Sequence, residues 1–278
     1  EDPMKLSLTS WSLRALSLTE AVGLSKLLGV GALDIGYFYG PALDKQALLA
    51  DPAAMAAKVR ALDIMVPCFY HLFGATLPDR NLADPGALKQ NLVDFPKVMD
   101  FCRQAHIPTV FILPGVVNAG QSRDQALAQS VDALKAMLPI ADDAGVTLTI
   151  EPHVHSYLES PDITRRLLDR VEGLKLTLDY AHYVCLGYRQ DEIDPLAPYA
   201  AHVHLRQAKS GHLQTKFDQG TINFGAQFGT LRDAGFAGYA ALEVVHQDYM
   251  GTLFDDVLTE TVAIRDSFRS WTGAGGGN

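Results

Sequence analysis

The chain has 278 residues, of which 48% are hydrophobic and 20% are charged, so it can bury a large core and is not expected to be disordered. Its formal net charge of -9 at pH 7 leaves no broad basic field for a phosphate backbone, which argues against nucleic acid as a partner. Cys68, Cys102 and Cys185 are too few and too scattered for a disulfide framework, which favours a cytoplasmic location.

The two ends of the sequence show no targeting or anchoring pattern. The first residues lack a basic segment followed by an apolar one, and no uninterrupted apolar run reaches the roughly 18 residues of a membrane span. We therefore expect a soluble protein without a membrane partner. Residues 1–3, ahead of Met4, are interpreted as a remnant of expression, and residues 271–278, which end in GAGGGN, as a flexible tail.

Short apolar runs rich in β-branched residues alternate along the chain with longer stretches of helical period. In chain order, eight runs predict strands over residues 5–11, 31–38, 64–71, 108–115, 146–153, 174–182, 201–208 and 239–246. The helical stretches between them include residues 18–29, 87–105 and 124–145. Strands that alternate with helices form parallel sheets. Eight such units predict an α/β protein with a single (β/α)8 TIM barrel domain over residues 4–270, whose active site lies at the C-terminal ends of the strands.

The last four predicted strands each end in a side chain that can bind a metal ion, namely Glu151, Asp179, His204 and Glu243. Because side chains alternate across a strand, these polar residues share the face opposite the Leu, Ile and Val side chains that belong under the helices. Taken singly, each acid is equally well explained as a helix cap or a loop salt bridge. Three converging carboxylates would repel one another, however, and together the four residues predict a shared divalent cation. Mn²⁺ is the expected ion, with Mg²⁺, Co²⁺ or Zn²⁺ as alternatives.

Over nearly its whole length the chain resembles the xylose isomerase-like barrel superfamily, which includes sugar isomerases and epimerases, inosose dehydratases, dehydroshikimate dehydratase-like enzymes and a DNA-repair endonuclease. The resemblance rests on the motifs IEPH, LDYAH, HVHL and LEVV, which occur in the family's order. Its ketose 3-epimerase members imply that Glu151, Asp179, His204 and Glu243 hold the metal. They also imply that Glu151 and Glu243 exchange protons with the sugar carbon, and that His182 holds a substrate oxygen.

The sequence departs from the ketose 3-epimerases at two positions. Ser210 stands where these enzymes have an arginine, and Tyr157 stands where they have a glutamate. Arg206 or Lys209 is a candidate replacement for the arginine, and Glu159 is one for the glutamate. A strict ketose 3-epimerase is therefore doubtful.

The endonuclease branch fits less well than the sugar enzymes. That branch needs an additional histidine at the end of strand four and an Asp-x-His pair beyond the strand-seven ligand, because several metal ions must hold one phosphate. Here the fourth strand ends in FILPG, and the later segment offers Asp218 followed by Gly220. We therefore do not expect nucleic acid as a substrate.

Other polar side chains are expected to face the same barrel mouth and bind substrate. His71 ends the third predicted strand, and His153 follows Glu151 by two residues and so shares its face. For His71 a buried core histidine is the alternative. Arg206 lies one layer above His204, where a guanidinium can clamp a carboxylate or a diol, with a surface salt bridge as the alternative.

Residues 206–225 form a long connection with several glycines, which predicts a lid. Lys209 and His212 are candidate substrate-binding residues on this segment, although a solvated loop would have the same composition. His202 lies one layer below His204, where we expect a structural partner and not a ligand.

Together these inferences predict a divalent-metal-dependent isomerase or epimerase that removes a proton next to a carbonyl of a sugar or polyol-derived substrate. Glu151, Glu243 and His182 are its candidate catalytic residues. The alternatives are a dehydratase or lyase that eliminates a β-leaving group from a keto sugar or inosose, a metal hydrolase, and a non-catalytic sugar-binding barrel. Aromatic residues that end the first two strands are expected either to form an apolar wall for a sugar ring or to belong to the core, namely Trp11, Tyr37 and Phe38. A homo-oligomer that pairs through the barrel rim is left open.

Overall fold

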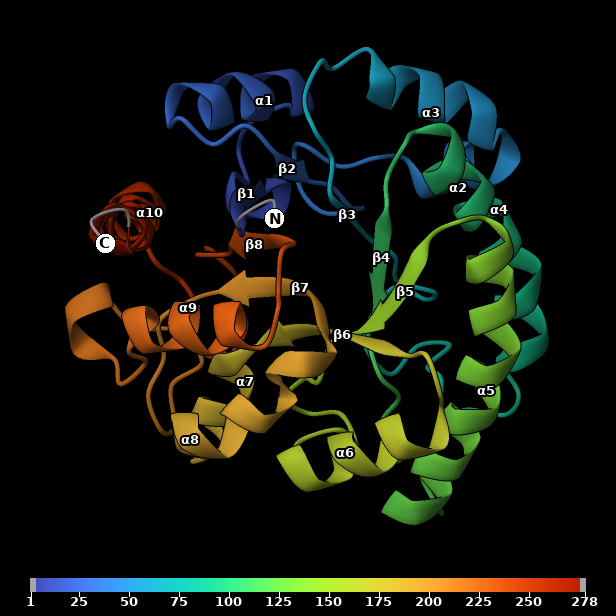
Figure 1. Ribbon diagram of the computed structural model, residues 1–278. Helices are drawn as coiled ribbons and strands as arrows, with labels where there is room; N and C mark the ends of the chain where they lie inside the picture. The colour runs from blue at the N-terminus through green and yellow to red at the C-terminus, as the bar shows by residue number, and fades with distance from the viewer. Residues whose placement is uncertain (1–3, 276–278) are drawn as a thin grey trace.

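The computed structural model describes residues 4–275, in which eight parallel strands surround a central axis with helices on the outside (Figure 1). The strands are β1 (Lys5–Thr9), β2 (Leu33–Asp34), β3 (Cys68–Tyr70), β4 (Thr109–Ile112), β5 (Thr147–Ile150), β6 (Lys175–Asp179), β7 (Ala200–Leu205) and β8 (Tyr239–Leu242). They are ordered β2-β1-β8-β7-β6-β5-β4-β3. Isolated parallel bridges from β2 to the β3 region, including Ile35 to Phe69, nearly close the circle. The predicted TIM barrel is confirmed.

Helices follow most of the strands and cover the outer face of the barrel. They are α1 (Leu18–Leu27), α2 (Lys45–Ala50), α3 (Pro52–Arg60), α4 (Leu88–Gln104), α5 (Arg123–Asp143), α6 (Pro161–Arg170), α7 (Tyr180–Cys185), α8 (Gln190–Ile193), α9 (Phe224–Asp233) and α10 (Val257–Gly275). Three 3₁₀ helices also occur, η1 (Ser10–Ser12), η2 (Asp194–Tyr199) and η3 (Phe217–Gln219). The predicted helices over 18–29, 87–105 and 124–145 correspond to α1, α4 and α5.

Local sequence signals begin and end these helices. In α5, the Ser122 side chain accepts from the backbone of Gln125 while the Gln125 side chain accepts from the backbone of Ser122, which forms a capping box. Beyond its end, Gly145 has a φ of 68°, a left-handed conformation that glycine adopts at little cost. No helix within residues 4–275 is long and apolar enough to span a membrane.

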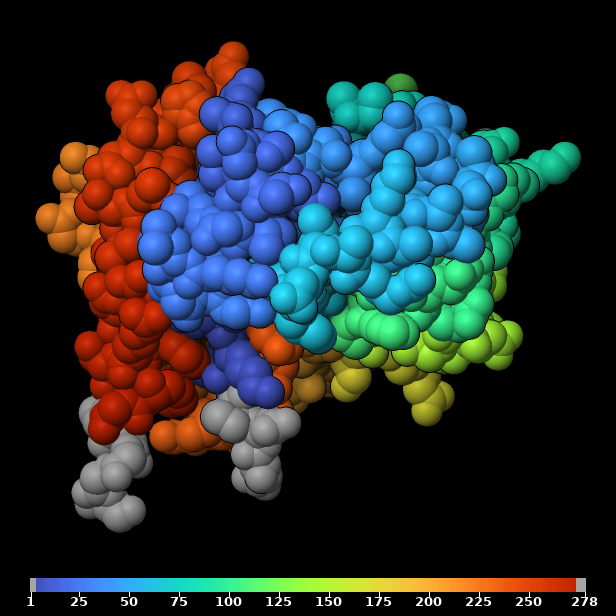
Figure 2. Space-filling model, turned by 90° about the horizontal axis from the view of Figure 1, so that it is seen from above, coloured from blue at the N-terminus to red at the C-terminus, as the bar shows by residue number. Residues whose placement is uncertain are grey.

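The first and last helices lie side by side on the outside of the barrel, which Figure 1 and the view from above in Figure 2 both show. Arg265 of α10 donates to the carbonyl of Leu28, just past α1, at 2.9 Å. The prediction of a flexible tail from residue 271 is wrong at its start, because α10 continues to Gly275 and the Trp271 ring packs on Phe228. Residues 1–3 and 276–278, on which the other terminal predictions fall, lie outside the described residues.

The two faces of each strand have different surroundings. Side chains such as Val110 and Leu148 point outward and join the large buried core beneath the helices. Side chains of the other face fill the barrel interior, where Thr149 and Thr177 join through their hydroxyl oxygens at 2.7 Å. The interior is therefore partly polar, and it leads upward to the C-terminal ends of the strands.

Candidate active site at the barrel mouth

Four metal-binding side chains converge where β5 to β8 end. One ligand atom each of Glu151, Asp179, His204 and Glu243 lies within 4.8 Å of the others, and all four residues are buried. Asp179 ends β6 and pairs in register with His204 of β7. Glu151 and Glu243 directly follow β5 and β8, and their backbone N–H groups continue the ladder by donating to neighbouring strands at 3.1 and 3.0 Å. The barrel therefore brings together the four residues that the sequence grouped.

The imidazole of His204 lies between the two glutamates. Its Nδ1 atom is 2.7 Å from Oε1 of Glu151 and 3.0 Å from Oε2 of Glu243. Trp11 lies in the segment after β1, the strand next to β8, and its indole N–H donates to the other oxygen of Glu243 at 2.8 Å and so fixes that carboxylate. The side chains of Glu151, His204 and Glu243 therefore face a common centre.

Asp179 has two roles, one for each oxygen. Its Oδ1 atom accepts from the backbone N–H of Ala181 at 2.8 Å and caps the short helix α7. Its Oδ2 atom faces the cluster, 3.1 Å from the guanidinium of Arg206. The helix-cap interpretation and the ligand interpretation of this acid are thus compatible, because the carboxylate divides its oxygens between them.

Arg206 lies inside the cluster and not on the surface. The residue is only 5% exposed, and its guanidinium contacts Asp179 at 3.1 Å and Glu243 at 3.4 Å. It therefore supplies positive charge to two of the three carboxylates, so a cation bound between the acids is not their only source of compensation. The alternative of a surface salt bridge is wrong for this residue.

The two glutamates titrate in opposite directions because their partners differ. Burial raises the pKa of Glu151 to about 7, although His204 partly opposes the shift. Burial acts on Glu243 in the same sense, but the charges of His204 and Arg206, with hydrogen bonds from His204 and Trp11, outweigh it and lower the pKa to about 2. Two carboxyl groups with pKa values so far apart are suited to different roles in proton transfer.

His182, on α7, presents one defined nitrogen to the cluster. Its Nδ1 atom accepts from the backbone N–H of Val154 at 3.2 Å, so the ring proton resides on Nε2. Nε2 lies 3.5 Å from Oδ2 of Asp179 and 3.9 Å from Oε1 of Glu151. Burial holds the pKa of His182 well below its ordinary value. The residue is therefore a neutral hydrogen-bond donor aimed at the centre of the site.

His153 stacks beside this donor. The two ring centroids of His153 and His182 are 4.1 Å apart, and Nδ1 of His153 donates to the carbonyl of Val154 at 2.7 Å. Burial lowers the pKa of His153 to about 4. With Nδ1 protonated, its Nε2 atom is left as an acceptor at the edge of the cavity.

A cavity of about 210 Å³ opens above the cluster. Its polar lining comes from Thr76, Glu151, His153, His182, Arg206, Glu243 and Gln247. Its apolar and aromatic lining comes from Trp11, Phe38, Tyr39, Tyr70, Leu72, Leu77, Leu113, Leu213 and Tyr249. Arg206 is the only Lys or Arg among the lining residues, all of which lie in the described part of the chain.

The family described as "Xylose isomerase-like TIM barrel" matches residues 24–271. The chain belongs to this family. No curated protein sequence matches the chain.

Several solved structures share its fold at low sequence identity. D-Psicose 3-epimerase with D-tagatose from Clostridium cellulolyticum H10 is 16% identical, with a TM-score of 0.74 over 96% of this chain and 99% of that chain. The IOLI protein with a bound zinc atom is 17% identical, with a TM-score of 0.73 over 96% and 98%. The probable 3-DHS dehydratase AsbF from Bacillus anthracis is 15% identical, with a TM-score of 0.70 over 94% and 98%. These likenesses show a shared barrel.

Within this family barrel, His71 does not face the mouth, and the expectation that it does is wrong. Cys68 and Tyr70 point into the barrel from β3, so His71 points to the outer side, where it is fully buried. Its Nδ1 atom lies 3.0 Å from the hydroxyl of Tyr37. Tyr37 is therefore also turned away from the cavity, whereas Phe38, expected with it in the apolar wall, does line the cavity.

Residues 206–225 do not form the expected lid. The buried Gln207 side chain donates to the carbonyls of Phe217 and Ile222, which ties the segment down on itself. Lys209 and His212 pair with each other in a tight turn and do not line the cavity, so their predicted contact with substrate is wrong in this structure. The cause is local hydrogen bonding, which the glycine-rich composition does not reveal.

The segment that does reach over the mouth follows β8, and the sequence analysis missed it. Gln247 and Tyr249 both line the cavity. Gln214 fixes the base of this segment, because its side-chain amide exchanges two hydrogen bonds with the backbone of Val245 at 2.8 and 2.9 Å. The ring centroid of Tyr249 lies 6.1 Å from that of His153 across the mouth. An aromatic residue two positions before a glycine, in a long connection after the last strand, was the available signal.

Proposed function

We propose that this protein is a divalent-metal-dependent isomerase or epimerase that moves a proton at the carbon next to a carbonyl of a sugar or polyol-derived substrate. The observation that carries the proposal is the convergence of three buried carboxylates and one imidazole within 4.8 Å at the floor of the cavity. Such a donor set fits a divalent ion with oxygen and nitrogen ligands. Membership of the xylose isomerase-like family supports the same class of chemistry.

Glu151, Asp179, His204 and Glu243 would hold the ion. A bound zinc atom in the IOLI protein supports a divalent metal in this barrel, and the predominance of carboxylate oxygens keeps Mn²⁺ as the proposed ion. Bound there, the metal would act as a Lewis acid that makes the carbon next to a substrate carbonyl more acidic. The remaining steps belong to the side chains.

Glu243 is the proposed general base. It borders the cavity, the guanidinium of Arg206 at 3.4 Å favours its ionised form, and the indole of Trp11 holds one of its oxygens at 2.8 Å. Glu151, with a pKa of about 7, is the proposed partner that returns a proton. His182 would donate from Nε2 to a substrate oxygen, because its tautomer is fixed by the Val154 N–H. His153 lies beside it as an acceptor for a substrate hydroxyl.

The lining favours a neutral substrate over a phosphorylated one. The single cationic side chain, Arg206, already contacts Asp179 and Glu243 and so has little charge left for a phosphate. The aromatic side of the cavity offers surfaces such as Trp11 and Tyr39 for the apolar face of a sugar ring. A monosaccharide-sized carbonyl compound is the substrate class that we propose.

Elimination of a β-leaving group is the second candidate reaction. The two positions that distinguish ketose 3-epimerases do not serve the cavity here, since Ser210 is exposed and the Tyr157 hydroxyl is buried against Ser130. Glu159, offered as a replacement, contacts Arg123 instead and does not line the cavity. The likeness to the probable 3-DHS dehydratase AsbF supports this alternative. The cytoplasmic location and a homo-oligomeric state stay predictions.

Deuterium exchange tests the proposal and separates the two reactions. The Mn²⁺-loaded protein is incubated in D₂O with a panel of ketoses, inososes and 3-keto sugars, and the products are followed by NMR. Deuterium on the carbon next to the carbonyl, with an inverted centre or a moved carbonyl, is the expected result. Loss of water or of another leaving group identifies the lyase. Metal-loaded protein that binds these sugars without any exchange or product would contradict an enzymatic role.

A further inference from the structure

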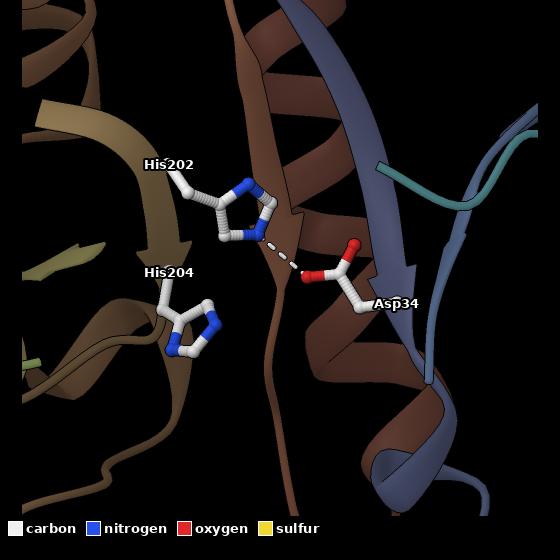
Figure 3. Close-up of side chains that lie close together, drawn as sticks. All are labelled: Asp34, His202 and His204. Atoms are coloured by element: carbon white, nitrogen blue, oxygen red, sulfur yellow. Dashed lines mark hydrogen bonds and ion pairs between the residues drawn. The ribbon is translucent and has the colours of Figure 1, made fainter. Parts of the chain in front are cut away.

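A buried acid and a buried histidine lie directly beneath the proposed metal ligands, inside the barrel (Figure 3). Asp34 ends β2, and His202 lies on β7 two residues before His204. Their side chains are 0% and 1% exposed, and Oδ2 of Asp34 is 2.6 Å from Nε2 of His202. The hydrogen bond crosses the barrel interior between strands that are not neighbours in the sheet. Placing two ionisable groups at this depth costs free energy unless their remaining polar atoms also find partners.

Asp34 and His204 each have one buried polar atom with no hydrogen-bond partner among the described residues. The two atoms are Oδ1 of Asp34 and Nε2 of His204. Ligand atoms of Asp34, His202 and His204 lie within 4.8 Å of one another. Figure 3 shows the Nε2 edge of the His204 ring turned toward the side from which Asp34 projects. A carboxylate oxygen that lacks a donor and a ring nitrogen that lacks an acceptor thus lie in the same small space.

The opposite edge of the His204 ring is already committed. Its Nδ1 atom lies 2.7 Å from Glu151 and 3.0 Å from Glu243, on the side of the proposed metal. An imidazole that binds a metal through Nδ1 must keep its proton on Nε2. A histidine ligand usually gives this second N–H to a carboxylate, a carbonyl or a water molecule, which orients the ring and makes it a stronger ligand.

We propose that Asp34 is a positioning residue for the metal ligand His204, and that His202 holds Asp34 in place. Asp34 accepts the Nε2–H of His204 through one bridging water molecule, since the two side chains make no direct hydrogen bond. The inference rests on the metal site of the proposed function. It adds two residues, Asp34 and His202, that support the site from below without binding the metal. It also explains why an acid and a histidine occupy this depth, where Thr149 and Thr177 on β5 and β6 satisfy each other with hydroxyl groups alone.

Metal affinity measured on folded variants tests the inference without relying on turnover. Mn²⁺ and Co²⁺ are titrated into the wild-type protein, Asp34→Asn and Asp34→Ala, with folding checked by circular dichroism. We expect affinity to fall about 10–100-fold in Asp34→Ala, the usual cost of losing such an outer partner, and less in Asp34→Asn, which keeps an oxygen acceptor. The visible spectrum of bound Co²⁺ should shift in both variants, because the ligand strength of His204 changes.

Asp94→Asn is the matched control. Asp94 is also a buried carboxylate, but it pairs with Arg80 at 2.8 Å away from the metal residues, so its loss should lower stability and leave metal affinity and the Co²⁺ spectrum unchanged. His202→Gln should weaken metal binding less than Asp34→Ala, since it acts one step further from the ligand.

A measurement on the unmodified protein covers the case in which the variants fail to fold. In ¹⁵N-resolved NMR of the protein loaded with diamagnetic Zn²⁺, we expect a slowly exchanging Nε2–H proton on His204. A His204 without that proton, wild-type metal affinity in folded Asp34→Ala, or two ions per chain with one bound by Asp34 and His202 would overturn the inference. A wild-type protein that binds no divalent ion would instead refute the proposed function itself.

Discussion

Strands β1 to β4 and strands β5 to β8 build the two halves of one barrel mouth, yet their ends carry different chemistry. The second half supplies the acids and the imidazole that converge at the floor of the cavity. The first half supplies aromatic and aliphatic side chains, and the Tyr70 and Phe111 rings stack there with centroids 4.3 Å apart. The half with charged groups is suited to bond making and breaking, and the apolar half is suited to shaping and desolvating the substrate.

Trp11 connects the two halves. It comes from the η1 segment after β1, packs edge-on against Tyr70, and donates its indole N–H to Glu243. The apolar side therefore contributes one hydrogen bond that acts on the charged side.

Substitution of Glu243 by Gln should give the largest effect. The amide keeps the shape and an oxygen donor but cannot accept a proton, so we expect turnover to fall by about 10²–10⁴-fold while metal stays at least partly bound. Turnover is measured by deuterium incorporation, with metal content determined on the same sample. Glu159→Gln, which removes an acid outside the cavity, is the control and should leave turnover unchanged. Wild-type turnover in a folded Glu243→Gln protein would refute its role as the base.

Removal of the His182 imidazole should mainly weaken substrate binding. His182→Ala deletes a buried donor aimed at the site, so we expect KM to rise about 10–100-fold while metal affinity changes little. Steady-state kinetics and a metal titration together check this. His212→Ala, on an exposed turn, should behave like the wild-type protein. If KM stays the same in the first variant, His182 does not contact the substrate.

Replacement of Trp11 by Phe tests the connection between the halves. The ring is largely kept but the N–H that favours ionised Glu243 is lost, so the pKa of Glu243 should rise. Because the base must be ionised, the acidic limb of the kcat/KM profile should move to higher pH. The pH profile of the folded variant measures the shift. An unchanged acidic limb would mean that Trp11 only packs.

The smallest expected effect concerns a residue outside the mouth. Burial holds the pKa of His71 well below its ordinary value, so below about pH 6.5 the unfolded chain takes up a proton that the folded protein does not bind. This contribution to stability is present above that pH and is lost as the pH falls. In His71→Gln the unfolding free energy should therefore decrease less steeply as the pH falls, by up to about 1.4 kcal/mol per pH unit. Denaturant unfolding at several pH values measures the slope, and an equally steep decline would contradict the assignment.

The sequence predicted the inward-facing residues correctly on strands whose inward and outward faces differ clearly in polarity. On β5 to β8, polar residues alternate with Leu, Ile and Val, so the inward positions of Glu151 and Asp179 follow from the pattern. On β3 the pattern fails, because Cys68, Phe69, Tyr70 and His71 are all residues found in cores. Because the inward face of β3 was assigned wrongly by one residue, His71 was predicted to face the cavity and Tyr70, which does line it, was not.

Side-chain reach and loop contacts limited the rest. Strand position placed Arg206 one layer above the ligands, but its long side chain folds back to contact Asp179. The fixed conformation of residues 206–225 depends on Gln207, whose side chain donates hydrogen bonds to carbonyls 10 and 15 residues away along the chain. Such contacts depend on the folded barrel and leave no periodic signal in the sequence.

Metal binding by wild-type protein and Asp179→Asn tests the central claim most directly. Both proteins, stripped of metal, are titrated with Mn²⁺ under conditions where circular dichroism shows them folded. The account predicts one ion per wild-type chain. It predicts that Asp179→Asn binds Mn²⁺ more than about a hundredfold more weakly than the wild-type protein. Loss of a residue that only supports a ligand costs about 10–100-fold in metal affinity, and Asp179→Asn removes the charge of a direct ligand. A wild-type protein that binds no Mn²⁺, or a folded Asp179→Asn protein with undiminished affinity, would contradict it.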